Sequence, residues 1–170
     1  MPKESVATNF RLNTNHDPYV TDYDLNNTVN GWFVPSMPDL NQRNPEVMRY
    51  LTQNSIWWIE QSGIDGIRMD TYPYADMQAM SKWCADVLRE YPDLNIVGEC
   101  WTRPASAVAY WQSGVKNYNG FDSNLPTVMD FPVEESIRQA LENDGKEWGA
   151  GLTRVYDAVA QDYLYADVNK

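Results

Sequence analysis

Two short apolar stretches of the chain each carry a carboxylate toward their C-terminal end. One is Gly66-Ile67-Arg68-Met69-Asp70 and the other is Val97-Gly98-Glu99-Cys100-Trp101. Glycoside cleavage uses such a pair, in which one ionised carboxylate is the nucleophile and its surroundings keep the other carboxyl protonated as an acid. Asp70 and Glu99 are therefore the candidate catalytic residues, and Arg68 is the cation beside them.

The alternation of side chains along a strand predicts how the first stretch is oriented. Arg68 and Asp70 fall on one face, and Ile67 and Met69 fall on the other. Burying a charged pair inside a parallel sheet is costly unless it faces a wet cleft, and βα folds keep their sites at the C-terminal ends of strands. Since a parallel βαβ unit needs about thirty residues, we expect Glu99 to face Asp70 across one cleft.

A purely structural interpretation fits the same spacing. In it, Asp70 only caps the helix that follows its strand, and Glu99 only forms a salt bridge with Arg68. Residue types at these positions do not distinguish the catalytic interpretation from the structural one. The surrounding elements and further motifs are needed to distinguish them.

Hydrophobic periodicity predicts the elements that position these residues. An N-cap at Asn44 with Pro45 after it starts a helix that Gly63 stops, and Asp76 caps a second helix that ends before Pro92. Further periodic runs predict strands at 64–70, 95–101 and 126–131, helices at 104–111, 133–141 and 151–161, and a loop at 114–124. Alternating strands and helices predict an α/β fold with a parallel sheet, although three strands are too few to close a barrel. The first 44 residues show no sustained periodicity and are expected to be irregular or to form short strands.

Composition narrows the class of ligand. The chain has 170 residues, 43% of them hydrophobic and 22% charged, which is typical of a globular protein, and its net charge is −11. That charge, without a basic cluster, disfavours nucleic acid and anionic membranes as partners. Seven tryptophans and eleven tyrosines in an acidic chain suit neutral polyhydroxylated ligands such as sugars. Cys84 and Cys100 are too few for a disulfide framework or a structural zinc site and are expected to be buried thiols.

The two carboxylate stretches resemble the second and third signature regions of the α-amylase family of glycoside hydrolases (glycoside hydrolase family 13). Met37-Pro38-Asp39-Leu40-Asn41 is similar to the fifth conserved region of that family. Three further stretches look most like the neopullulanase and cyclomaltodextrinase type of bacterial starch-utilisation systems, namely 31–34, 54–59 and 124–132. The resemblance covers essentially the whole chain.

The resemblance implies a fold, a reaction and a set of site residues. The fold is a partial (β/α)8 TIM barrel, with about strands four to six at 45–170 and the end of the inserted loop domain at 1–44. The reaction is retaining hydrolysis of α-glucan oligosaccharides by double displacement. Apart from the resemblance, the residues lead us to expect no cofactor and no metal. Asp70 is the implied nucleophile, Glu99 the general acid and then base, and Arg68 the cation that keeps Asp70 ionised. The expected substrate contacts are Trp101, Tyr72, Tyr74, Asp39 and Asn41.

Some residues depart from the family pattern. Tyr74 stands where the family usually has a histidine, and the third catalytic aspartate of the family, in an Asn-His-Asp motif, does not belong to this chain. The only histidine, His16, matches those letters but precedes the other motifs, so we expect it to lie in a loop. Asp22, Asp24 and Asn26 alternate as calcium ligands do, but Phe33 occupies the twelfth position, where an EF-hand needs glutamate.

Three expectations about the molecule as a whole follow. The parent protein is expected to hydrolyse α-glucans while the isolated chain is inactive; the alternative is a non-catalytic glucan-binding or scaffold fragment of the same fold. Open sheet edges predict self-association. No secretion signal or membrane-spanning stretch is apparent in the sequence, and only the resemblance suggests a bacterial parent that is periplasmic or extracellular.

Overall fold

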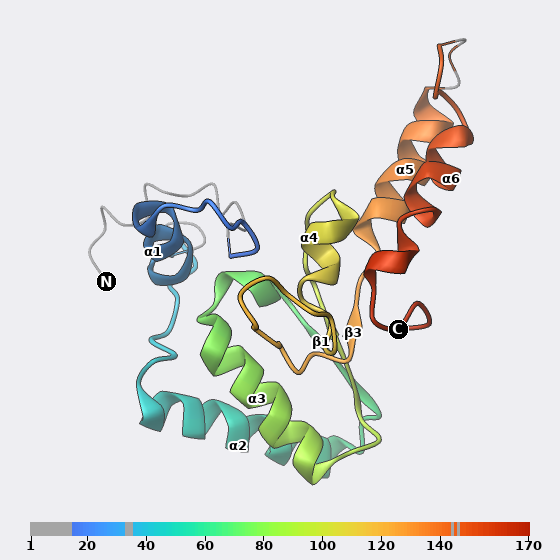
Figure 1. Ribbon diagram of the computed structural model, residues 1–170. Helices are drawn as coiled ribbons and strands as arrows, with labels where there is room; N and C mark the ends of the chain where they lie inside the picture. Colours follow the sequence, from blue (N-terminus) through green and yellow to red (C-terminus); the bar gives the residue numbers. More distant parts are fainter. Residues whose placement is uncertain (1–14, 33–35, 144, 146) are drawn as a thin grey trace.

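The computed structural model describes residues 15–32, 36–143, 145 and 147–170 of the chain. Its centre is a parallel sheet of three strands in the order β1-β2-β3, formed by Gly66–Met69, Asn95–Gly98 and Thr127–Val128 (Figure 1). Gly66 pairs with Asn95 and Met69 with Gly98, while Val97 pairs with Thr127. The predicted α/β fold with a parallel sheet is confirmed.

Each strand is shorter than its apolar stretch predicted. β1 ends at Met69 and β2 at Gly98, one residue before Asp70 and Glu99 respectively. A single further backbone bond, from the Glu99 N–H to the Met69 carbonyl at 2.9 Å, continues the pairing. Both acids therefore lie where the ladder gives way to loops, at the same edge of the sheet.

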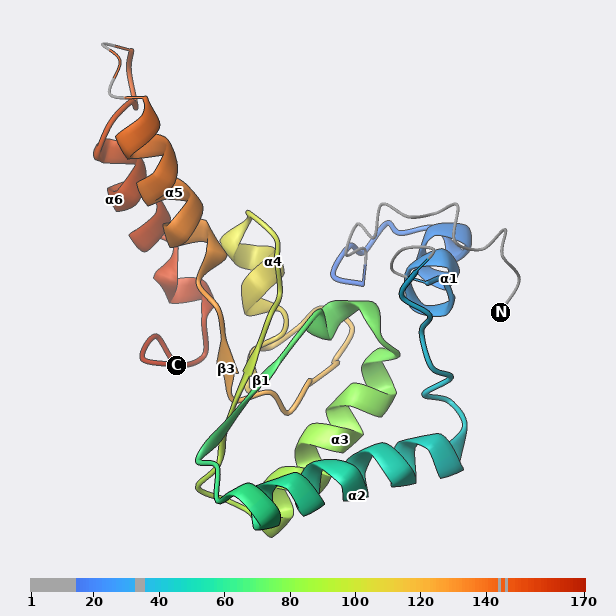
Figure 2. The same ribbon diagram turned by 180° about the vertical axis from the view of Figure 1, so that it is seen from behind.

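Helices α2 (Pro45–Ser62) and α3 (Met77–Glu90) cover one face of the sheet (Figure 2). The local signals of the sequence set their ends. The Asn44 side chain accepts the Glu46 N–H, and Gly63 ends α2 in the left-handed region at φ +60°. The Asp76 carboxylate accepts the N–H groups of Gln78 and Ala79 at the start of α3.

The main core lies between these helices and β2. Ile96 of β2 and Val87 of α3 are fully buried, and Trp83 packs there while its indole N–H donates to Ser55 Oγ of α2 at 3.0 Å. Trp57 and Trp58 of α2, by contrast, are each 51% exposed. The burial of Ile67 and Met69 against this core, with Arg68 facing away, follows the predicted alternation along β1.

The expectation of an irregular first 44 residues is wrong for one segment, because α1 forms over Asp22–Asn30. Capping stabilises this helix: Thr21 Oγ1 accepts the Asp24 N–H at 3.1 Å, and its hydroxyl donates to the Asp24 carboxylate at 2.7 Å. Only Thr28 and Val29 are buried in α1, so hydrophobic periodicity carried no signal. Asp22 and Asp24 lie in its first helical turn rather than in a calcium loop; Phe33 lies outside the described residues.

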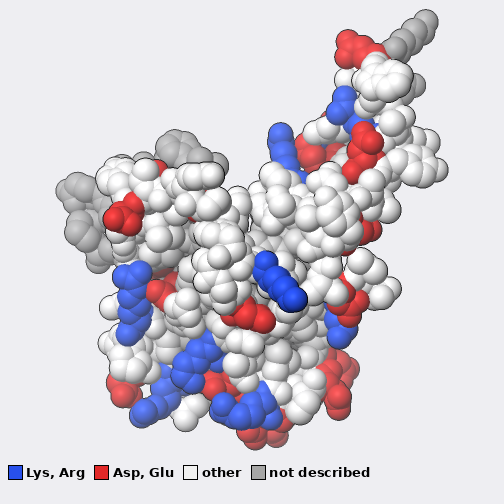
Figure 3. Space-filling model, in the orientation of Figure 1, with Lys and Arg blue, Asp and Glu red and all other residues white. Residues whose placement is uncertain are grey.

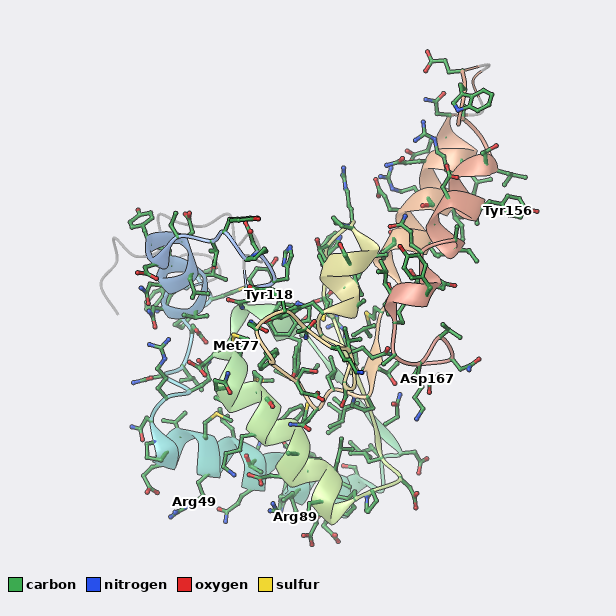
Figure 4. The ribbon with its side chains drawn as sticks, viewed as in Figure 1. Arg49, Met77, Arg89, Tyr118, Tyr156 and Asp167 are labelled. Carbon is green, nitrogen blue, oxygen red and sulfur yellow. The ribbon has the colours of Figure 1, made fainter. Side chains whose placement is uncertain are left out.

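The C-terminal third forms a helical arm. Helix α4 (Ala105–Ala109) leads into the loop before β3, and α5 (Phe131–Glu142) and α6 (Thr153–Val159) pack side by side and project from the sheet (Figures 1 and 2). α5 starts two residues before the predicted 133 because Asp130 accepts the Val133 N–H and caps it. The Tyr156 side chain on α6 points into solvent and is 78% exposed (Figure 4).

A buried glutamine in the turn after α4 binds the segment 167–170. The Gln112 side chain is 1% exposed, and its amide NH2 donates to the carbonyls of Asp167 and Lys170 at 2.8 and 2.7 Å. Its amide oxygen accepts the Asp167 N–H at 3.0 Å. Asp167 is labelled in Figure 4, in the segment that returns below α5 and α6.

Charged side chains of opposite sign alternate over α2 and α3 (Figure 3). The ion pairs there include Arg43–Asp76 at 2.7 Å, Arg49–Glu46 at 3.4 Å, Lys82–Asp86 at 2.6 Å and Arg89–Asp86 at 2.9 Å. Hence the basic side chains of this face are largely neutralised by neighbouring acids. Among the described residues, no helix combines the length and hydropathy of a membrane span.

Candidate active site

One guanidinium group connects the two candidate acids. Arg68 Nη1 lies 2.5 Å from Asp70 Oδ1, and Arg68 Nη2 lies 2.6 Å from Glu99 Oε1. Asp70 follows β1 and Glu99 follows β2, and the in-register parallel pairing of these strands brings both residues to one edge. The structure thus brings together the three residues that the sequence singled out.

The two carboxyls have different surroundings. The side chain of Glu99 is 14% exposed, whereas that of Asp70 is 57% exposed. A hydrogen bond from Glu99 is the largest cause that lowers the pKa of Asp70, with burial opposing it and Arg68 adding to the lowering. The lowered pKa favours the ionised form of Asp70.

A backbone amide completes the environment of Glu99. The Thr71 N–H donates to Glu99 Oε2 at 2.9 Å, so the two carboxyl oxygens of Glu99 have different partners. Thr71 is the residue directly after Asp70, and its backbone has φ +48°. The sequence did not predict a role for Thr71, because neither the type nor the spacing of a single threonine indicates a left-handed backbone conformation.

The purely structural interpretation is only half met. The Glu99–Arg68 salt bridge that it predicted is present. Asp70, however, caps no helix: the 3-10 turn η2 (Tyr72–Tyr74) begins after Thr71 without a side-chain cap, and Asp76 caps α3.

A cavity of about 360 Å³ opens beside Asp70. Its wall includes Asp39, Tyr74 and Thr71 together with apolar side chains of α2 and α3. Residues 37–39 of the segment 37–41 therefore line this cavity. Asn41 is not part of the cavity wall; its side-chain oxygen accepts the Arg43 N–H at 3.2 Å within its own turn.

Trp101, which follows Glu99 in the sequence after Cys100, does not line that cavity. Its side chain is 72% exposed, and its ring stacks on Phe131 with a centroid distance of 5.8 Å and an interplanar angle of 15°. One face of the indole therefore rests on a ring, and most of the side chain remains open to solvent.

Tyr72 requires a correction, because its ring cannot stack on a sugar. The residue is 1% exposed, its hydroxyl donates to the Ser123 carbonyl at 3.1 Å, and its ring meets Trp111 edge to face at 5.8 Å. The sequence placed Tyr72 correctly in the loop after Asp70, but η2 turns it inward. Its role is to anchor that loop in the core.

His16 lies in a turn, as expected. The neighbouring Asn15 donates to the Pro73 carbonyl at 3.1 Å, and the His16 ring meets Tyr110 edge to face at 6.4 Å. Burial lowers the pKa of His16. Within the described ranges, no three His, Cys, Asp or Glu side chains group as metal ligands would.

A parallel sheet that presents two carboxyls and an arginine at the ends of adjacent strands is the arrangement expected of a glycoside hydrolase catalytic domain. The model of the α-amylase catalytic domain matches residues 9–165, and the chain therefore belongs to the α-amylase family.

Individual relatives agree. The chain is 42% identical over 69 residues to a cyclomaltodextrinase of Geobacillus thermopakistaniensis, covering 41% of this chain and 12% of that protein. It is 38% identical over 124 residues to neopullulanase 2 of Thermoactinomyces vulgaris, covering 71% and 19%. The α-amylase of Geobacillus thermoleovorans, solved with acarbose, superimposes with a TM-score of 0.69 at 27% identity, covering 88% of this chain and 31% of that one. The chain thus spans less than a third of each of these proteins.

Proposed function

We propose that this chain is an incomplete catalytic domain of a retaining α-glucan hydrolase that cuts starch-derived oligosaccharides by double displacement. In this proposal β1, β2 and β3 are barrel strands four, five and six, residues 45–170 are the partial barrel, and residues 1–44 are the end of the inserted loop domain. The observation that carries the proposal is the single Arg68 guanidinium that contacts Asp70 and Glu99 together.

Asp70 is the proposed nucleophile. It attacks the anomeric carbon and forms the glycosyl-enzyme, a step that needs an ionised carboxylate. Its pKa is lowered by the hydrogen bond from Glu99 and by the Arg68 guanidinium, and so Asp70 stays ionised well into the acidic range. Its 57% exposure leaves the carboxylate accessible.

Glu99 is the proposed acid and then base. In the first step it gives a proton to the glycosidic oxygen as the bond to the leaving sugar breaks. Ionised Glu99 then takes a proton from the water that hydrolyses the glycosyl-enzyme. Its carboxyl oxygens already contact Arg68 and the Thr71 N–H, two donors that favour the ionised form it adopts between the steps.

The Arg68 guanidinium that the two acids share supports retention over inversion. In inverting enzymes a water lies between the base carboxylate and the sugar, and the two carboxyl groups are roughly 6.5–9.5 Å apart. In retaining enzymes the two carboxyl groups are about 5–5.5 Å apart. Asp70 and Glu99 contact the same Arg68 guanidinium at 2.5 and 2.6 Å, which favours the shorter spacing of a retaining pair.

Two regions of the surface support a sugar substrate. The cavity beside Asp70 offers the polar groups of Asp39 and Tyr74, and the Trp101 ring on Phe131 offers a flat apolar face. Flat rings next to hydrogen-bonding groups suit neutral sugars. The names of the cyclomaltodextrinase and neopullulanase relatives point to α-glucans as the class.

The test compares this chain with a protein that carries the complete catalytic domain. We expect the complete domain to release sugar of retained anomeric configuration, as monitored by proton NMR. Asp70→Asn and Glu99→Gln should each reduce kcat by at least about a thousandfold and leave binding largely intact. Tyr156→Phe, on the projecting helix α6 and outside the cavity beside Asp70, is the matched control.

The isolated chain should show no measurable hydrolysis, since the third family aspartate is not among its residues. Inverted product, or turnover that survives Asp70→Asn, would refute the assignment. Oligosaccharide binding by the complete domain without any turnover would favour the alternative, a non-catalytic glucan-binding or scaffold role.

A further inference from the structure

We infer that Thr71 is a positioning residue, whose left-handed backbone holds its amide against Glu99 and thereby fixes the orientation of the acid and base. The inference rests on the proposed function for the role of Glu99. It rests on the structure for the hydrogen bond and the backbone conformation, which are independent of that role.

The backbone of Thr71 is in an unfavourable region. Its dihedral angles are φ +48° and ψ +35°, where a β-branched residue meets steric conflict and glycine would not. Such strain persists only where the surrounding structure imposes it, and it concentrates at functional sites. Thr71 lies between the proposed nucleophile, Asp70, and the buried turn η2. It is therefore next to a functional residue on one side and next to a segment that can impose the strain on the other.

The residues after Thr71 impose its conformation. Tyr72 is 1% exposed and its hydroxyl is bound to the Ser123 carbonyl, and Pro73 is also fully buried. The Tyr74 N–H closes the turn by donating to the Thr71 carbonyl at 3.0 Å. A change of φ at Thr71 to negative values would swing this turn out of the core, and so the buried ring and the strained residue are set together.

The ring of Tyr72 fits against β2 next to Glu99. A Cβ on Gly98 would lie 3.3 Å from Tyr72 Cγ and 2.5 Å from Leu125 Cδ2, so the absence of a side chain at Gly98 admits the ring. Gly98 directly precedes Glu99. The loop after β1 therefore packs onto β2 at the residue before the acid, which places the Thr71 amide at Glu99 Oε2.

A backbone donor differs from a side-chain donor in what it contributes. Arg68 reaches Glu99 Oε1 through a flexible side chain that it also extends to Asp70, whereas the Thr71 N–H has no side-chain rotamer to lose. It holds Oε2 at 2.9 Å and leaves the carboxyl plane little freedom to rotate. Preorganised donors of this kind keep a reacting group in its productive geometry.

The first experiment uses NMR on this 170-residue chain. An amide that donates to a carboxylate shows a proton shift that follows the ionisation of that carboxylate. We expect the Thr71 amide resonance to titrate, to keep titrating in Asp70→Asn, and to lose that titration in Glu99→Gln. Thr71→Val, which replaces the hydroxyl by a methyl group and leaves the backbone N–H in place, should behave like the wild type in this titration.

The second experiment removes the donor itself. Replacing the 70–71 amide by an ester, with the threonine side chain retained, should move the limb of the pH–rate profile that is set by Glu99 to higher pH by about one unit in the complete catalytic domain. A purely structural role would lower activity at all pH values without moving this limb.

The outcomes separate the inference from the proposed function. If the Thr71 amide ignores Glu99→Gln, or if the ester leaves the pH profile in place, the positioning role is refuted. If the amide follows Glu99 while the complete domain hydrolyses nothing, the contact stands and the proposed function falls, and with it the role of the contact in catalysis.

Discussion

Arg68 Nη2 lies 2.6 Å from Oε1 of Glu99, a residue on the neighbouring strand and 31 positions away in the chain. Arg68 is paired in register with Val97, so its side chain reaches forward to the acid beyond the end of β2. The other terminal nitrogen contacts Asp70 Oδ1 at 2.5 Å. The fork of the guanidinium thus sets the spacing between acids on two strands.

Arg68→Lys should separate the effect of the positive charge from the effect of holding two carboxyls at once. An ammonium group is a single point of charge and cannot hold two carboxyls in one plane, so the pKa of Asp70 should rise and kcat of the complete domain should fall roughly a hundredfold. Carboxyl carbon NMR and steady-state kinetics measure the two effects. Arg49→Lys, at the exposed Arg49–Glu46 pair, is the control and should change neither. Unaltered turnover in Arg68→Lys would show that charge alone suffices.

Gly98→Ala should destabilise the fold by about 1–3 kcal/mol, the usual cost of overpacking a core. The added methyl group meets Leu125 Cδ2 at 2.5 Å and the Tyr72 ring at 3.3 Å. Urea unfolding measures the free energy. In a Leu125→Ala background, part of the conflict disappears and the cost of Gly98→Ala should shrink. An equal cost in both backgrounds would mean that the conflict with Leu125 is not its source.

Stability should decline in alkali partly through Cys84. Burial raises the pKa of this thiol to about 12, whereas in the unfolded chain it is about 8.5. Between these values the folded state keeps a proton that the unfolded state has lost, and so the free energy of unfolding falls as pH rises. Urea titrations from pH 8 to 11 should show a shallower decline for Cys84→Ala than for the wild type. Parallel slopes would contradict the assignment to this thiol.

The isolated chain should self-associate at micromolar concentration. Tyr50, Trp57 and Trp58 on α2 are 68%, 51% and 51% exposed, and β1 and β3 are the edges of the described sheet. Exposed aromatic groups and open edges favour association. Sedimentation velocity should show a dimer that Trp57→Lys weakens and Tyr156→Lys, on the projecting α6, does not. A monodisperse wild-type monomer would show that three βα units are stable without self-association.

Local signals made much of the fold predictable. Caps at Asn44 and Asp76 fixed the starts of α2 and α3 because they act within a few residues. Alternation along β1 put Arg68 and Asp70 on one face, and the length of a βαβ unit placed Glu99 beside them.

The rest depended on contacts between distant segments. Tyr72 looked like a sugar-stacking residue because it follows Asp70, but Ser123 and Gly98, both far along the chain, draw it into the core. Thr71 acquires its backbone conformation from that same packing. Helix α1 escaped prediction for the opposite reason, since it buries too little apolar surface to show a period.

The Gln112 amide imitates a peptide group. It offers one acceptor and an NH2 donor to the backbone at Asp167 and Lys170, as a neighbouring strand would, although residues 167–170 form no strand. Segments without regular secondary structure usually exchange their amide hydrogens with water readily. Here the Asp167 amide is paired with a side chain that is itself inaccessible to water, so its exchange should be slow and should follow the opening of the turn after α4.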